Sequence, residues 1–114
     1  MTSGPSQPER CATPFFMAAL FAAMDAEVTV YFTMEGIRLV QRGVADTLSV
    51  VKGGKTVIEF MRDAKAAGVT FRACAPSMPG FGVSGSELIP ELDDVSSGGA
   101  LADLILESDK VLTF

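Results

Sequence analysis

Two short apolar segments constrain the fold of this chain more than any other feature: residues 27–33 (EVTVYFT) and residues 69–74 (VTFRAC). Both are rich in β-branched and aromatic residues, which favour strands. Between them, Thr56 and Glu59 have the spacing of a capping box, and the helix that they begin is expected to end at Gly68. A strand, a helix and a second strand in this order predict a parallel pair of strands with a helix packed on the sheet.

The remaining segments continue this alternation. Thr13 and Pro14 predict a helix start, with Thr13 as the cap, and the helix is expected to run to about Met24. The other expected elements are helices at 35–42, 87–92 and 99–108, short strands at 47–51 and 110–114, and an extended piece at 93–97. The chain is therefore expected to form one α/β domain, residues 1–114, with a mainly parallel sheet.

The first of these helices is apolar on every side. A helix that covers one face of a small sheet needs only one apolar face. We therefore expect this helix to be covered either by more of its own chain or by another copy of the protein.

The composition excludes several classes of function. There is no histidine and no tryptophan, so catalytic sites built on a histidine base and zinc sites that use histidine are excluded. The chain has 9 basic and 14 acidic residues, and residues 87–109 hold half of the acids and no Lys or Arg, so a nucleic-acid partner is not expected. The apolar run 15–24 is half of the about 20 residues that cross a bilayer, and no membrane segment or secretion signal is expected.

Two short motifs lack the context that their chemistry requires. Residues 80–85 match G-x-G-x-x-G, but they follow two prolines instead of a strand, and Pro90 cuts short the next helix. We keep an anion or nucleotide at this loop only as a minor alternative. Residues 54–56 (GKT) resemble the end of a phosphate-binding loop, but the glycine needed five positions earlier is replaced by Ser49. No C-x-x-C pair is present, so neither a metal nor a cofactor is expected.

Cys74 is the main candidate for chemistry. It ends a predicted strand and begins a loop at 75–85, at the edge of a parallel sheet where ligands gather. Arg72 should share its side of the strand, and a guanidinium nearby would stabilise a thiolate. The alternative is that Cys74 is a buried residue that only packs, and the residues alone leave both open.

Cys11 precedes the first helix and is a second, weaker candidate. It could resolve an intermediate on Cys74 as a disulfide, or it could be a passive loop cysteine. Two cysteines do not make a disulfide framework, so a reducing cytoplasm is expected.

Three stretches together resemble the DsrE/DsrF-like family of small α/β proteins linked to sulfur relay. They are TSGPSQPERCATPFFMAALFAAMDAEVTVYFTMEG, GGKTVIEFMRDAKAAGVTFRACAPSM and GGALADLILESDKVLTF. The resemblance implies a three-layer α/β/α fold of flavodoxin-like topology, and assembly into oligomers such as trimers or hexamers. In sulfur-relay members it also implies a cysteine that carries sulfur as a persulfide, which here would be Cys74.

The resemblance also implies a strand just before the TSGP segment, whereas the sequence begins at that segment. We therefore expect the first strand to be missing or truncated, with the slot covered by the amino end or a partner. The leading hypothesis is an oligomeric cytoplasmic sulfur carrier with Cys74 as the persulfide site, Arg72 as a tuner of its pKa, and donor and acceptor proteins as partners. The alternative is an interaction or small-ligand-binding module of the same fold without covalent chemistry.

Overall fold

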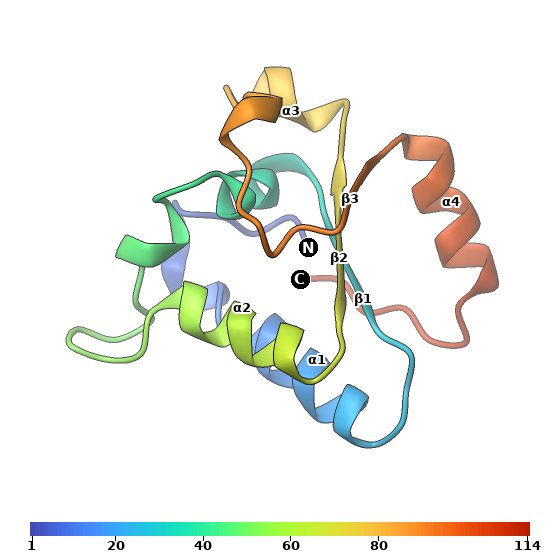
Figure 1. Ribbon diagram of the computed structural model, residues 1–114, viewed down its shortest axis with the longest axis horizontal. Helices are drawn as coiled ribbons and strands as arrows, with labels where there is room; N and C mark the ends of the chain where they lie inside the picture. Colours follow the sequence, from blue (N-terminus) through green and yellow to red (C-terminus); the bar gives the residue numbers. More distant parts are fainter.

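A three-stranded parallel sheet separates two layers of helices (Figure 1). The computed structural model describes residues 1–114. The strands lie in the order β1-β2-β3, and both pairings are parallel, which confirms the expected α/β fold with a parallel sheet. Two helices, α1 and α2, cover one face, and α4 stands on the other side (Figure 1). The bounds are α1 Thr13–Ala23, β1 Thr29–Phe32, α2 Val57–Ala66, β2 Thr70–Cys74, α3 Ser77–Gly80, β3 Asp94–Ser96 and α4 Gly98–Glu107.

Three phenylalanines join the sheet to α1 at the centre of the core. Phe15 of α1 lies 5.8 Å from Phe32 of β1 and 5.7 Å from Phe71 of β2, measured between ring centroids. All three side chains are fully buried. Because side chains alternate along a strand, Tyr31 and Cys74 point to the face opposite this core.

Helix α2 confirms the clearest local prediction. The backbone N–H of Thr56 donates to the Glu59 carboxylate at 2.7 Å, as in a capping box. The helix buries Met61 completely, and the chain leaves it through Gly68 at a φ of 98°. Such a positive φ strains any residue with a Cβ, which is why glycine suits this turn.

Helix α1 begins at the expected place with a different cap. Its N-cap is Ala12, and Thr13, predicted as the cap, is already the first helical residue. The chain enters α1 almost directly from a 3-10 helix, Pro8–Arg10, so the extended residue that a side-chain cap requires is missing. The helix buries Pro14, Phe15 and Ala18 and leaves much of its apolar surface exposed.

Four predicted elements differ in the structure. Residues 35–42 form a 3-10 helix, Met34–Val40, in place of an α-helix. The expected strand at 47–51 is reduced to a single bridge between Ser49 and Thr56, and the expected helix at 87–92 to a 3-10 turn, Gly85–Glu87. The predicted strand at 110–114 is absent from the sheet. An apolar pattern is local, but a strand also needs a partner that offers a free edge.

The amino end of the chain lies beside β1. The Met1 amino group donates to the Tyr31 carbonyl at 2.7 Å, and the Thr33 N–H donates to the Met1 carbonyl at 3.1 Å. On the other side, the Thr2 N–H donates to the Phe114 carbonyl at 2.6 Å. The amino end therefore covers part of the free edge of β1.

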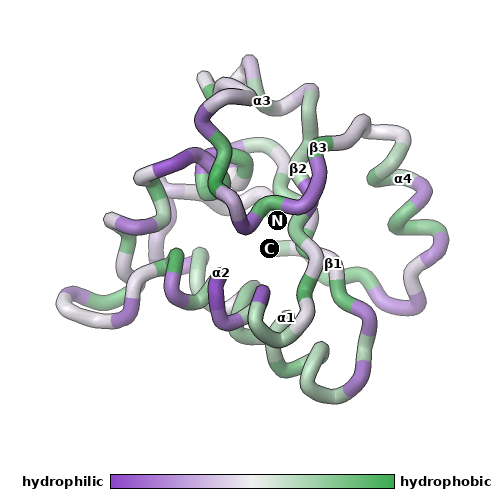
Figure 2. The backbone as a smooth tube through the Cα atoms, in the orientation of Figure 1, coloured by the Kyte–Doolittle hydropathy of each residue, from purple (hydrophilic) through white to green (hydrophobic).

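Helix α4 packs loosely although it is hydrophobic along much of its length (Figure 2). None of its residues is buried, and Leu106 is 83% exposed. The Ser97 side chain caps it by accepting from the Ala100 N–H at 3.2 Å. No helix in the structure combines the length and hydrophobicity needed to cross a membrane.

Candidate functional site

Cys74 lies at the carboxyl end of the central strand, as the sequence predicted. It is 7% exposed and is not part of the contiguous apolar cluster that includes Phe71 and Ala73. Its backbone is held in the sheet opposite Ser96 of β3. The strand thus presents the thiol at the edge of the sheet where parallel α/β folds place their chemistry.

Three hydroxyl groups from separate parts of the chain lower the pKa of the Cys74 thiol. They belong to Tyr31 in β1, Thr33 just after β1, and Ser77 at the start of α3, which adds its backbone N–H. Parallel strands bring these positions together because β1 and β2 end at the same edge. The sulfur is therefore surrounded by hydrogen-bond donors.

The hydroxyl of Ser77 links the ends of the two strands. Its Oγ lies 3.1 Å from the Thr33 Oγ1, and it accepts from the Met34 N–H at 3.1 Å. Met34 has a φ of 51°, an uncommon conformation for a residue with a side chain. Strained backbone of this kind gathers at functional sites, where the surrounding contacts hold it in place.

Tyr31 reaches across β2 to the beginning of the segment after β3. Its hydroxyl donates to the Ser97 carbonyl at 3.0 Å, and the Ser96 carbonyl is a longer acceptor at 3.4 Å. The Ser96 Oγ donates to the Tyr31 hydroxyl at 3.3 Å. These contacts fix the phenol ring beside Cys74.

The surroundings favour the thiolate form of Cys74. Burial by itself raises the pKa of the thiol, but the hydrogen bonds from Ser77, Thr33 and Tyr31 outweigh it, and the pKa lies below its ordinary value. A hydrogen bond to the charged form stabilises that form, which is the cause of the shift. A thiol of this kind has more thiolate near neutral pH than a free cysteine.

Arg72 pairs with an acid on the neighbouring strand. Its Nε lies 3.2 Å from the Asp94 Oδ2, and the two residues are in register across β2 and β3. The groups that lower the pKa of Cys74 are the hydroxyls and the Ser77 N–H. A role for Arg72 in tuning the thiol stays a prediction.

Cys11 lies in a different environment. It is fully buried in the core cluster, and its thiol donates to the carbonyls of Gly4 at 3.3 Å and Gln7 at 3.5 Å. Burial, with the negative charges of Glu35 and Glu9, raises the pKa of Cys11 to about 11. None of its hydrogen bonds reaches the Cys74 cluster, and its role as a resolving thiol stays a prediction.

Neither glycine motif has the local structure of a phosphate site in this fold. After Gly80 and Gly82 the chain forms only the 3-10 turn Gly85–Glu87, so no helix N-terminus stands ready for a phosphate. Thr56 caps α2, and the preceding Lys55 forms an ion pair with Asp63. No group of three or more His, Cys, Asp or Glu side chains gathers to hold a metal ion.

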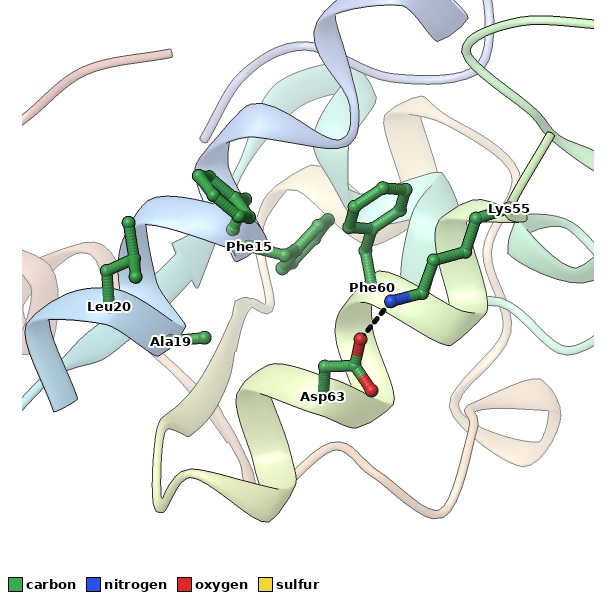
Figure 3. Close-up of a pocket in the computed structure, with 7 residues that line it drawn as sticks. Phe15, Ala19, Leu20, Lys55, Phe60 and Asp63 are labelled. Carbon is green, nitrogen blue, oxygen red and sulfur yellow. Dashed lines mark hydrogen bonds and ion pairs between the residues drawn. The ribbon is translucent and has the colours of Figure 1, made fainter. Parts of the chain in front are cut away.

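A shallow apolar groove lies between α1 and α2, on the other side of the sheet from Cys74 (Figure 3). It encloses about 310 Å³, and the Lys55 Nζ lies 4.6 Å from the centroid of the Phe60 ring at its rim. The residues that line it are Phe15, Phe16, Ala19, Leu20, Lys55, Phe60 and Asp63.

The fold and the site define a class: small α/β proteins with a parallel sheet and a cysteine at the carboxyl end of the central strand. The sequence model of the DsrE/DsrF-like family matches residues 1–114, and the chain belongs to this family.

One solved structure similar to this chain is the crystal structure of the YchN protein from E. coli. The TM-score is 0.71 at 20% sequence identity, over 88% of this chain and 82% of that chain. This likeness supports the fold. No curated protein matched the sequence.

The sequence analysis missed the three hydroxyl residues around Cys74. Tyr31 could have been found because it alternates with Val30 and Phe32 and is the only tyrosine. Thr33 directly follows β1 at the same edge of the sheet as Cys74. Ser77 follows Cys74 by three residues, but its direction depends on the turn that forms α3.

Proposed function

We propose that this protein is a sulfur carrier that holds sulfur as a persulfide on Cys74. The observation that carries the proposal is the set of donors around the sulfur, which lowers the pKa of the thiol although it is nearly buried. Membership of the DsrE/DsrF-like family, which is linked to sulfur relay, supports this choice among thiol chemistries.

The chemistry is a transfer between sulfurs without net oxidation. The Cys74 thiolate attacks the terminal sulfur of a donor persulfide, a new S–S bond forms, and the donor leaves as a thiolate. In the second step an acceptor thiolate attacks the terminal sulfur on Cys74, and Cys74 leaves as a thiolate in turn. Neither step needs a histidine or a metal, in agreement with the composition.

The burial of Cys74 suits a persulfide that must be protected from the solvent. Cys74 is only 7% exposed, so the residue is sheltered from most of the solvent at the edge of the sheet where a partner would approach. A reducing cytoplasm, as proposed from the cysteine content, would keep the thiol available between transfers.

We also propose that the protein assembles with copies of itself, as a trimer or a hexamer. The support is the outer surface of α1, where Phe16 and Leu20 line the groove of Figure 3 and are 53% and 43% exposed, and where Met24, the C-cap of the helix, is 78% exposed. Apolar surface of this kind is costly to leave in water. Leu20→Glu should shift the mass measured by light scattering to that of a single chain, and an unchanged mass would reject α1 as the interface.

Mass spectrometry tests the carrier function. After incubation with a persulfide donor, the wild type should gain about 32 Da, the mass of one sulfur atom, on the peptide that holds Cys74. Cys74→Ser should gain nothing, whereas Cys11→Ser should gain as much as the wild type. An unmodified wild type would reject the proposal.

The second candidate is a binding module in which Cys74 only packs. The low exposure of Cys74 is the observation that favours it. In that case Cys74 should react with alkylating reagents no faster than an ordinary thiol at neutral pH. A faster reaction would favour the carrier.

A further inference from the structure

The hydroxyl of Tyr31 has one proton and more than one acceptor. In the structure it donates to the Ser97 carbonyl at 3.0 Å, while the Ser96 Oγ donates to it at 3.3 Å. The Cys74 side chain lies on the same face of the sheet, and its strand partner is Ser96, whose carbonyl lies 3.4 Å from the Tyr31 hydroxyl, so this hydroxyl can reach the sulfur. A carbonyl is a neutral acceptor, and a thiolate is a charged and therefore stronger one. Ionisation of Cys74 thus changes which acceptor suits the Tyr31 proton best.

The proton stays on Tyr31 throughout. Burial raises the pKa of the Tyr31 phenol, and the neighbouring Cys74 raises it further, while the pKa of Cys74 is lowered. The phenol is therefore the weaker acid of the two, and it donates a hydrogen bond to the thiolate without losing its proton.

The other two hydroxyls are less free to change partners. The Ser77 Oγ accepts from the Met34 N–H and lies 3.1 Å from the Thr33 Oγ1, so these groups hold each other in place. Of the three hydroxyl residues, only Tyr31 also hydrogen-bonds to Ser96 and Ser97 at the end of β3.

We propose that Tyr31 stabilises the thiolate of Cys74 by turning its hydroxyl proton from the Ser97 carbonyl to the Cys74 sulfur. This inference deepens the proposed function and rests on it for the sulfur step. When an acceptor thiolate attacks the terminal sulfur of the persulfide, the Sγ–S bond breaks and its electron pair goes to Cys74. The Tyr31 hydroxyl then donates a hydrogen bond to the negative charge that forms on the Cys74 sulfur, which makes Cys74 a better leaving group.

The composition provides a direct probe of this residue. Tyr31 is the only tyrosine and the protein has no tryptophan, so the near-ultraviolet absorbance and emission of tyrosine report on this site alone. As the pH rises towards neutral, the tyrosine signal should change with the same midpoint as the rate of Cys74 alkylation. The change should disappear in Cys74→Ser and remain in Cys11→Ser, and its persistence in Cys74→Ser would overturn the proposal.

Tyr31→Phe keeps the buried ring and removes only the hydroxyl. We expect the midpoint of the alkylation profile to rise by about one pH unit and persulfide release to a small thiol to slow about tenfold, the effect of one hydrogen bond to a charged group. Ser96→Ala is the matched control, because it removes a hydroxyl that donates to Tyr31 and that does not itself lower the pKa of Cys74, and it should change both values less than threefold.

The two measurements separate this proposal from the proposed function. If Tyr31→Phe leaves the alkylation midpoint where it is in the wild type, Tyr31 does not stabilise the thiolate and the proposal fails. If the midpoint moves but the wild type never gains a sulfur atom, the contact is correct and the carrier function is wrong.

Discussion

The two cysteines of this chain have almost the same burial and opposite acidity. Cys11 is fully buried and Cys74 is 7% exposed, yet the pKa of Cys11 is raised to about 11 and that of Cys74 is lowered. The thiol of Cys11 donates to the carbonyls of Gly4 and Gln7, which can only accept a hydrogen bond. The sulfur of Cys74 meets hydroxyls and an N–H, which can donate.

The difference shows that burial raises the pKa of both thiols, and that hydrogen-bond donors together reverse this shift at Cys74. Burial, with the negative charges of Glu35 and Glu9, raises the pKa of Cys11 and keeps this thiol protonated. Donors compensate the loss of water around Cys74 and stabilise its thiolate. We therefore expect Cys11 to be a packing residue of the core and Cys74 to be the reactive thiol.

The largest expected effect is the contrast in reactivity. The pKa of Cys11 is about 11 and that of Cys74 is below its ordinary value, so the thiolate fractions near neutral pH should differ by at least about a hundredfold. Labelling with iodoacetamide at pH 7, followed by mass spectrometry of the peptides, should modify Cys74 first. Equal labelling rates at the two cysteines would contradict the difference in their acidity.

Alkaline pH should destabilise the fold through Cys11. Its pKa in the folded state is about 11, above the about 8.5 of an unfolded cysteine, so the folded state binds more protons in this interval. The free energy of unfolding should then fall with rising pH, by about 3 kcal/mol over the whole window. Urea unfolding at pH 8 and pH 10.5 measures this loss, and Cys11→Ala should show a smaller one. The same slope in both proteins would show that Cys11 is not the cause.

Ser77→Ala tests the donors around Cys74. The variant removes one hydroxyl from the sulfur and an acceptor from the Met34 N–H. Alkylation of Cys74 at pH 7 should slow about tenfold, because its pKa rises. Ser86→Ala, an exposed serine whose hydroxyl contacts only Ser84, should react as the wild type does.

The smallest expected effect comes from Thr56→Ala. Loss of this cap should cost about 1 kcal/mol of stability, measured by urea unfolding. Thr56 contacts neither cysteine, so the alkylation rate of Cys74 should change less than twofold. A large rise in that rate would mean that Cys74 reacts through opening of the fold, and that its local donors do not explain its reactivity.

Local sequence patterns predicted the elements whose stability is local. Helix α2 begins at its capping box, and strands β1 and β2 fall within the two apolar segments. The predictions are wrong at 47–51, 87–92 and 110–114, where a short apolar pattern by itself predicts an element that the fold does not form. These segments needed a partner strand or a longer run of helical residues, and no local pattern reports either.

The sequence by itself determined the alternation of strands and helices, and with it the position of Cys74 at the carboxyl end of a parallel strand. It also excluded histidine chemistry by composition. Only the tertiary structure decided which cysteine has donors around it. Tyr31 and Thr33 are more than 40 residues from Cys74 along the chain, and only the parallel pairing of β1 with β2 brings their hydroxyls to the sulfur. Acidity depends on neighbours in space, because charge is stabilised over a few ångströms whatever the separation in sequence.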